Sequence, residues 1–299
     1  MSETSHHIHP RQVIVASLLA LTLSVPMYQY VHRLPKVSKE ATSAPAGLHI
    51  VSFNTQYWHP SERELVDAVS YEANDIVLFQ EHLQEHPDHS WGPTNRIAQL
   101  KAAVKDRYID AEGEVVTMSK WPIVARRGFD DGGPDGQVLR TDLAVAGRTI
   151  SVYNIHLPVH MHLELLDHPG RFAADLQANA RRREATLKKV TDDIAANRNP
   201  VVIGGDFNSS SAMHATQWFR EHLVDVYSAN HCTAPPDTFR IGKLLNWRID
   251  YIFLSRELTP TSYCTRTLDN ISDHRALLAS FTVGPNPLQL STLNQGKPQ

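Results

Sequence analysis

The chain has 299 residues, of which 41% are hydrophobic and 20% are charged. This composition is that of a folded globular protein and excludes an intrinsically disordered chain. The formal net charge is -3, so overall charge does not support a general nucleic-acid-binding surface, and a polyanionic substrate needs a local patch or a bound metal ion.

The first 47 residues divide into three segments. Residues 1–12 form a polar tail, and residues 32–47 are rich in Pro, Ser, Ala and Lys and are predicted as a flexible linker. Residues 13–31 carry no charge and approach the length of about 20 residues that crosses a bilayer. They are interpreted as a transmembrane signal anchor, a single hydrophobic helix, or as a signal peptide.

The side of the membrane on which the domain lies stays open. One cation precedes residues 13–31 and three come after them before residue 47, which by the positive-inside rule favours the cytoplasm for the domain. Signal-type N-termini, in contrast, usually export the domain that they precede. The sequence therefore predicts a chain anchored by one N-terminal helix, or a secreted or periplasmic protein.

A single catalytic domain is predicted over residues 48–283, with a loose tail after it over 284–299. Short apolar runs are predicted as strands, several of them buried on both faces, at residues 48–53, 75–79, 149–157, 200–205, 249–254 and 276–283. Amphipathic stretches are predicted as helices at residues 61–73, 94–104, 174–196 and 213–222. This alternation indicates sheets covered by helices.

Two further features have more than one interpretation. Cys232 and Cys264 form a disulfide or remain two thiols, because sequence alone does not give the Cα separation that a bridge requires. Residues 181–183, three consecutive arginines in a predicted helix, are interpreted as part of a solvated basic face, with nucleic acid or anionic lipid contact as the alternative.

Polar side chains lie at or near the ends of the predicted strands. In chain order they are Asn54, Gln80, Glu81, Asn154, His156, Asp206, Asn208, Asp250, Asp273 and His274. Polar groups at strand ends converge where loops gather, and α/β enzymes build their sites there. Carboxylate and amide oxygens suit Mg2+ or Mn2+, and histidines exchange protons near neutral pH. The set supplies the groups that phosphodiester hydrolysis needs, whereas no GxSxG elbow or Walker loop is present.

Each motif alone has a structural explanation, since GDFN is typical of a turn and SDH of a cap. Their order is more specific. The succession SFN, QE, NIHL, GDFN, RIDYIF and SDH resembles the endonuclease/exonuclease/phosphatase superfamily, the DNase I-like metal-dependent phosphoesterases, over residues 48–283. The resemblance implies an α/β fold, a four-layer α/β/β/α sandwich of two packed, mostly antiparallel β-sheets with outer helices.

The resemblance also implies roles for residues. Residues implied to hold Mg2+ or Mn2+ are Asn54, Glu81, Asp206, Asn208, Asp273 and His274, with Glu81 as the principal ligand. Residues implied to be catalytic are His156, Asp206, Asn208, Asp250 and His274. Asp250 is expected to fix the tautomer of His274, and His156 to act as a donor or general acid; either Asp206 or His274 takes the proton of the attacking water.

Arg140 and Asn154 are weaker candidates for contacts with the substrate phosphate, and a surface or strand-edge role is the alternative for Arg140. The expected substrate is a phosphate ester, with nucleic acid or a generic phosphodiester ranked before a phospholipid or inositol phosphate. A non-catalytic scaffold is the remaining alternative. The expected state is a monomer that contacts the membrane through its N-terminal segment.

Overall fold

The computed structural model describes most of residues 47–284. The described ranges are 47–57, 62–69, 73–82, 84–85, 91–92, 96–129, 137–162, 165–230, 237–241, 245–268 and 271–284. The predicted N-terminal tail and membrane segment lie outside these ranges, as do the linker and the C-terminal tail apart from Gly47 and Gly284. Cys232 is also outside them, so the disulfide stays untested. In the part of the chain that is described, no helix has the length and apolarity to span a bilayer.

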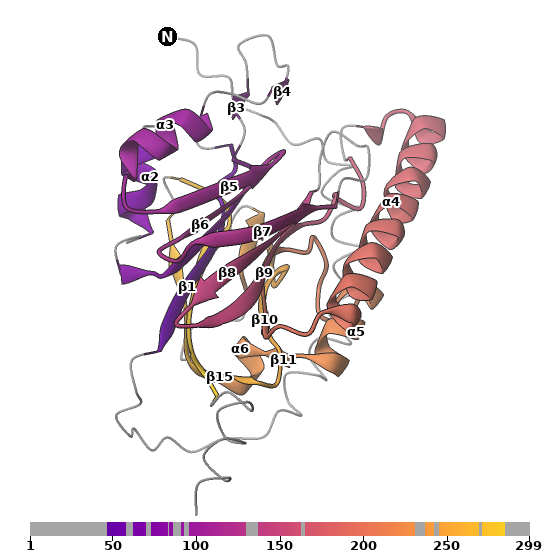
Figure 1. Ribbon diagram of the computed structural model, residues 1–299. Coiled ribbons are helices and arrows are strands. Elements are labelled where there is room, and N and C mark those ends of the chain that lie inside the picture. Colours follow the sequence, from indigo (N-terminus) through magenta and orange to yellow (C-terminus); the bar gives the residue numbers. More distant parts are fainter. Residues whose placement is uncertain are drawn as a thin grey trace, which may run out of the picture.

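Two six-stranded sheets form the body of the domain (Figure 1). The first sheet contains, in spatial order, β15 (Leu258–Thr267), β16 (Arg275–Val283), β1 (Leu48–Asn54), β2 (Ile76–Gln80), β6 (Val115–Ser119) and β5 (Tyr108–Glu112). The second contains β11 (Val224–Asp225), β14 (Asp250–Leu254), β10 (Val201–Asp206), β9 (Arg148–His156), β8 (Val138–Val145) and β7 (Ile123–Gly128). Smaller two-stranded sheets pair β12 (Phe239–Ile241) with β13 (Leu245–Trp247) and β3 (Gln84–Glu85) with β4 (Trp91–Gly92).

Each large sheet is antiparallel except for one parallel pair near its centre. These pairs are β1 with β2 and β9 with β10. The four strands are apolar along most of their length and largely buried, as expected for strands covered on both faces. Because parallel strands end at the same edge of a sheet, each pair delivers two strand ends side by side.

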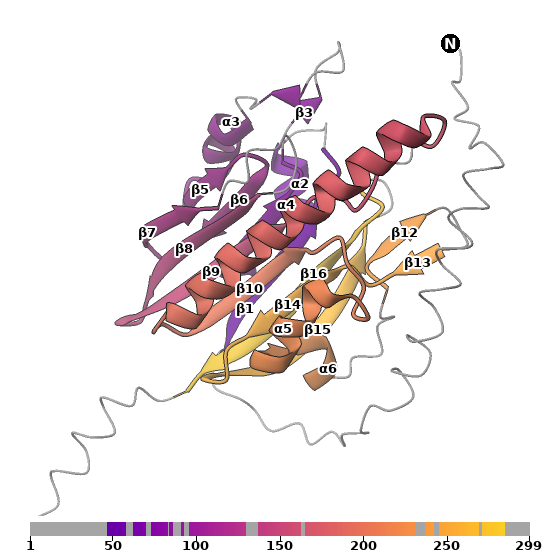
Figure 2. The same cartoon turned by 90° about the vertical axis from the view of Figure 1, so that its right-hand side faces the viewer.

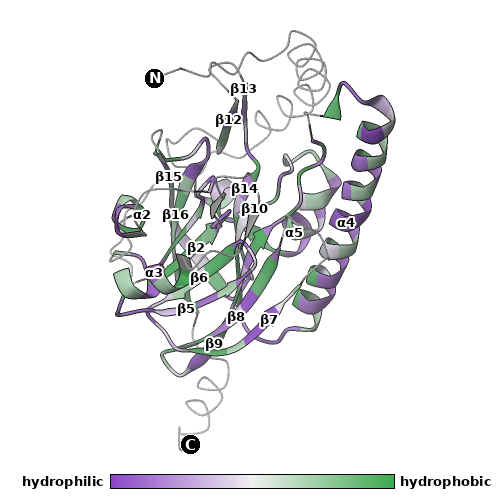
Figure 3. Cartoon of the chain, turned by 90° about the horizontal axis from the view of Figure 1, so that it is seen from above, coloured by the Kyte–Doolittle hydropathy of each residue, from purple (hydrophilic) through white to green (hydrophobic). Residues whose placement is uncertain are grey.

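Three clusters of buried apolar residues separate four layers. Between the sheets, Ile50 and Leu78 pack with Val152, Val202 and Ile252. On the outer face of the first sheet, side chains pack against α2 (Glu62–Ala68) and α3 (Arg96–Ala103). On the outer face of the second, they pack against α4 (Pro169–Ala196) and α5 (His214–His222). Figure 3 shows these helix pairs on opposite sides of the largely apolar strands.

The predicted four-layer sandwich of mostly antiparallel sheets is confirmed. All six predicted strands and all four predicted helices are present, with strand bounds within a residue or two of those expected. The short helix α6 (Val226–Ala229) was not predicted, nor were the strands β5, β6, β7, β8, β11 and β15 of the two large sheets. The β12–β13 hairpin stands at one end of the sandwich, beyond β16 (Figure 2).

Candidate active site

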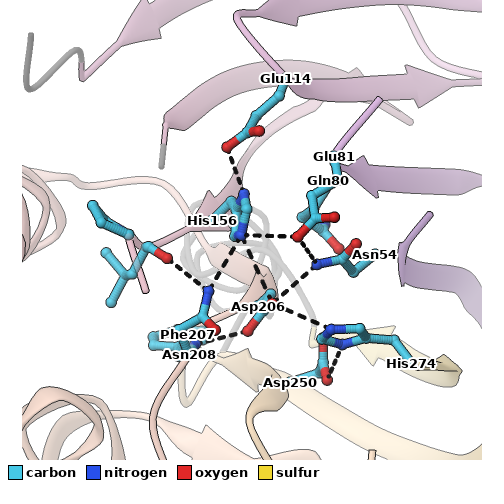
Figure 4. A network of polar contacts seen from close by, with 12 residues as sticks. Asn54, Gln80, Glu81, Glu114, His156, Asp206, Phe207, Asn208, Asp250 and His274 are labelled. Carbon is cyan, nitrogen blue, oxygen red and sulfur yellow. Dashed lines mark hydrogen bonds and ion pairs between the residues drawn. The ribbon is translucent and has the colours of Figure 1, made fainter. Parts of the chain in front are cut away.

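The candidate site lies where the two central parallel pairs end. In register, Asn54 faces Gln80 at the end of β1 and β2. Asp206 faces both His156 on β9 and Asp250 on β14. The two ends meet, because the Asn54 amide nitrogen donates to Asp206 Oδ2 across the sheets at 3.0 Å. Residues far apart in sequence therefore share one pocket (Figure 4).

Asn54 bridges the two carboxylates nearest to the centre of the site. Its Nδ2 donates to Glu81 Oε1 at 2.9 Å as well as to Asp206, while its Oδ1 accepts from the Gln56 backbone at 3.0 Å. In this orientation the amide presents nitrogen, not oxygen, to the pocket, and such orientations are assigned from the hydrogen-bond network. The role of Asn54 as a metal ligand therefore stays a prediction, and its observed role is to hold two carboxylates together.

Two histidines approach Asp206 from opposite sides. His156 Nε2 lies 3.8 Å from Asp206 Oδ2 and 3.6 Å from Glu81 Oε1, and His274 Nε2 lies 3.7 Å from Asp206 Oδ2. Both imidazoles therefore present Nε2 to the carboxylates at the centre of the pocket (Figure 4).

Each imidazole is held from behind by a buried carboxylate. His156 Nδ1 lies 2.6 Å from Glu114 Oε1, and His274 Nδ1 lies 3.0 Å from Asp250 Oδ2. A carboxylate on Nδ1 fixes the ring orientation and the tautomer. Each pair also joins the two sheets. Glu114 lies in the turn between β5 and β6 of the first sheet, and its partner His156 ends β9 of the second. Asp250 begins β14 of the second sheet, and its partner His274 directly precedes β16 of the first.

The GDFN segment depends on a glycine. Gly205 has φ +147, and a Cβ at this position would lie 1.9 Å from the Ile155 carbonyl oxygen. Only glycine tolerates this approach of β10 to β9, which brings Asp206 next to His156. The loop then turns through Asn208, whose φ is +45. Asn208 donates from its backbone N to Asp206 Oδ1 at 2.7 Å.

The Asn208 side chain is also fixed. Its Nδ2 donates to the Leu157 carbonyl at 2.8 Å and lies 3.3 Å from His156 Nε2. Positive φ values recur nearby at Gln56, Tyr57 and Glu81. Such conformations are costly for residues other than glycine and cluster at functional sites.

The SDH segment closes the other side of the site. Ser272 Oγ donates to the Asn54 carbonyl at 2.9 Å and accepts from His274 N at 3.0 Å. Asp273 lies at the rim, where its side chain is 35% exposed and its Oδ1 is 3.9 Å from His274 Nε2. The Phe239 ring of the β12–β13 hairpin packs on His274, with centroids 4.8 Å apart.

Burial shapes the charges of this pocket. It raises the pKa of Glu81 from 4.5 to about 7 and raises the pKa of Asp250 against the opposing effect of His274. For the two imidazoles burial acts in the lowering direction, but nearby carboxylates, first Glu114 for His156 and Asp250 for His274, outweigh it and raise each pKa to about 10. Perturbed ionisable groups clustered in one cavity are typical of functional sites.

The donor set fits a divalent cation. Ligand atoms of Glu81, His156 and Asp206 lie within 4.8 Å of one another, as do those of Asp206, Asp250 and His274. Two carboxylates with one imidazole suit Mn2+, and the carboxylates alone suit Mg2+, which prefers oxygen. A cation would also offset the cost of burying several carboxylates together.

Two candidate phosphate contacts do not reach the cluster. Arg140 on β8 pairs with Asp142 at 2.8 Å and with Asp193 of α4 at 3.1 Å. Asn154 is fully buried between the sheets, where its Oδ1 accepts from Gln80 at 2.7 Å; its Nδ2 donates to two carbonyls of the first sheet. Arg140 therefore belongs to an ion-pair network under α4, as its alternative strand role would allow, and Asn154 ties the sheets together.

Glu114 is the main site residue that the sequence did not indicate. It is 1% exposed and follows Gly113 in a turn, between two strands that were not predicted. Nothing in the run AEGEVV distinguishes it from an ordinary turn carboxylate. Arg183 also differs from its prediction, because it is buried and is not part of the solvated basic face.

Comparison with known proteins agrees with this geometry. The model of the endonuclease/exonuclease/phosphatase family matches residues 51–274. No curated protein matches the chain by sequence.

Solved structures share the fold. An endonuclease/exonuclease/phosphatase from Bacteroides vulgatus is 17% identical with a TM-score of 0.61, over 80% of this chain and 100% of that one. A mannosyl-6-phosphatase of Bacteroides thetaiotaomicron is 14% identical with a TM-score of 0.57, over 79% and 99%. TDP2 of D. rerio, in complex with a single-strand DNA product, is 16% identical with a TM-score of 0.57, over 80% and 100%.

Proposed function

Because the chain belongs to the endonuclease/exonuclease/phosphatase family, whose members are phosphoesterases, we propose that it hydrolyses phosphate esters with the help of Mg2+ or Mn2+. Phosphodiesters, as in a nuclease, rank before phosphomonoesters. The observation that carries the proposal is the meeting of two carboxylate-backed imidazoles and Glu81 around Asp206. In a pseudo-enzyme we would expect this set to have lost a member.

Glu81 and Asp206 would hold the cation, with His156 beside them. When bound, the cation would polarise the phosphoryl oxygens and offset the negative charge that develops on them. Asp206 would orient the attacking water, because it lies between both imidazoles. Either Asp206 or His274, fixed by Asp250, would take the proton of the water. His274 must be neutral to do so, and a bound cation at Asp206 would lower its pKa from about 10.

His156 and Asn208 would act on the phosphoryl group from the other side. His156 Nε2 is directed into the pocket by the Glu114 carboxylate on Nδ1, so it can donate to a phosphoryl oxygen or protonate the leaving group. The Nδ2 of Asn208 lies beside it and supplies a second, neutral donor. Donors fixed before the reaction stabilise the charge of the transition state with little reorganisation.

The substrate class needs a direct test. Purified protein is assayed with Mg2+ or Mn2+ on bis-p-nitrophenyl phosphate and p-nitrophenyl phosphate, and then on nucleic acids, phospholipids and inositol phosphates. We expect turnover of the diester that EDTA abolishes and that Glu81→Ala loses. Hydrolysis of lipid or inositol phosphates alone would favour the alternative substrate class, and a complete lack of activity would favour the scaffold.

We also propose that residues 13–31 attach the domain to a membrane or direct its export. The described domain begins at Gly47, and its first strand pairs with β2 and β16. Deleting residues 1–46 should therefore give a soluble protein with unchanged turnover. A truncated protein that aggregates or loses activity would contradict the assignment of 32–47 as a linker.

A further inference from the structure

Arg183 stands apart from its neighbours on helix α4. It belongs to a run of three arginines, yet it is 3% exposed, whereas Arg181 is exposed. It lies on the buried face of α4 together with Asn179, Thr186 and Val190. That face packs on the second sheet, close to the loops after β9 and β10 (Figure 2).

The guanidinium joins those two loops. Nη1 donates to the Pro158 carbonyl in the loop after β9. Nη2 donates to the Phe207 carbonyl at 2.9 Å and to Ser209 Oγ in the loop after β10. All three acceptors are neutral, and the planar group with several N–H donors can serve them together.

The three residues that accept from Arg183 lie on either side of Asn208 or next to a residue that it contacts. Phe207 and Ser209 are its two chain neighbours, and Pro158 comes directly after Leu157, whose carbonyl accepts from Asn208 Nδ2. Asn208 itself has a positive φ, a conformation that asparagine adopts more readily than most residues, and this turn sets the direction of the loop. We propose that Arg183 is a positioning residue that fixes Asn208 from both sides; this rests on the proposed function, in which Asn208 donates to the phosphoryl group.

Packing alone does not explain an arginine at this position. The Asp206 carboxylate attracts the guanidinium from nearby, but the hydrogen bonds of Arg183 go to neutral acceptors. Burying a cation in this way costs free energy, and an apolar side chain could pack on the sheet without that cost. Its removal would leave two carbonyls and one hydroxyl without their donor. The loop after β10 would then shift at the point where Asn208 contacts His156. Small displacements of a catalytic group lower the reaction rate strongly.

The proposal is tested with a double-mutant cycle on diester hydrolysis. Arg183→Met is made in the wild type and in an Asn208→Ala background, and Arg181→Met is the matched control because it removes the same charge from the exposed face of the same helix. We expect Arg183→Met to lower kcat about 10- to 100-fold with little change in KM, and Arg181→Met to leave kcat within about twofold. In the Asn208→Ala background the cost of Arg183→Met should nearly vanish.

Equal costs in both backgrounds would overturn the proposal, since Arg183 would then act independently of Asn208. If Arg183→Met does not fold, Arg183→Lys carries the same cycle, because lysine keeps the charge but donates from a single nitrogen, whereas the contacts to the two loops use both Nη1 and Nη2. An Arg183→Lys enzyme with wild-type kcat would also contradict the positioning role.

A second readout does not depend on activity. Hydrogen–deuterium exchange of the amides at residues 207–210 should be faster in the Arg183 variant than in the wild type and in Arg181→Met. Unchanged exchange would refute the positioning role even in an active enzyme. If the wild type hydrolyses no ester while exchange responds as expected, the proposed function fails and the loop-holding role stands.

Discussion

The two sides of the candidate active site each hold an imidazole against a buried carboxylate, but they differ in their exposure to solvent. On the His156 side, the imidazole and its carboxylate Glu114 are 3% and 1% exposed, and the Glu81 side chain beside them is 17% exposed. On the His274 side, the pair with Asp250 is also buried, but Asp273 beside it is 35% exposed. The more buried side suits the binding of a cation and a phosphoryl group, and the more exposed side suits the entry of water.

Asp206→Asn should have the largest effect, because Asp206 lies between both sides. We expect a fall in turnover of about a thousandfold. The thermal unfolding midpoint should change by only a few degrees, since asparagine fills the same volume although it keeps only one of the two accepting oxygens. Steady-state hydrolysis of bis-p-nitrophenyl phosphate and a thermal scan measure the two quantities. A rate near that of the wild type would remove Asp206 from the centre of the mechanism.

Replacing either histidine should separate the two sides. His156→Ala and His274→Ala should each lower turnover by about 100-fold, which is less than the loss expected for Asp206→Asn. If His156 protonates the leaving group, His156→Ala should lower the turnover of a p-nitrophenyl ester less than that of an alkyl ester. His274→Ala should lower the turnover of both substrates by the same factor. An equal leaving-group dependence in the two variants would show that the sides do not differ in this way.

The carboxylates behind the imidazoles should have smaller and matching effects. Glu114→Gln and Asp250→Asn keep the shape but remove the charge that stabilises an imidazolium. We expect each to lower turnover about 10- to 100-fold. Measuring kcat for both variants under identical metal concentrations tests the equivalence, and a silent Glu114→Gln would mean that only the His274 pair is used.

Asp273→Asn should have the smallest effect, because this carboxylate lies at the solvent-exposed rim. We expect a loss of about tenfold or less, seen mainly as a higher Mn2+ or Mg2+ concentration for half-maximal rate. Metal titrations of the variant and the wild type provide the measurement. A loss as large as that of Asp206→Asn would give Asp273 a central role in metal binding.

The sequence predicted the centre of the molecule better than its periphery. The central strands are continuous apolar runs, so composition alone identifies them. Outer strands are not: β7 reads IVARRG and is mostly exposed, and β15 reads LTPTSYCTRT with an irregular register around Pro260. Their pairing with neighbouring strands, rather than their own pattern, makes them strands.

Site residues at the ends of recognisable strands could be predicted, whereas those that depend on distant partners could not. Asp206 and His156 end strands that the sequence reveals, so their convergence could be expected. Glu114 and Arg183 act through partners 42 and 24 to 26 positions away, and no local pattern encodes those meetings. Asn154 was misassigned because a polar residue in a strand can face a ligand or tie two sheets, and sequence does not distinguish the two.

The cross-sheet construction of both imidazole–carboxylate pairs has a consequence for biosynthesis. His274 and β16 come last in the domain, yet β16 inserts between β1 and β15. A nascent chain, or a fragment cut before residue 274, therefore lacks one complete pair whatever else has folded. The proposed hydrolysis of phosphate esters should therefore reach its full rate only after the final strand is in place.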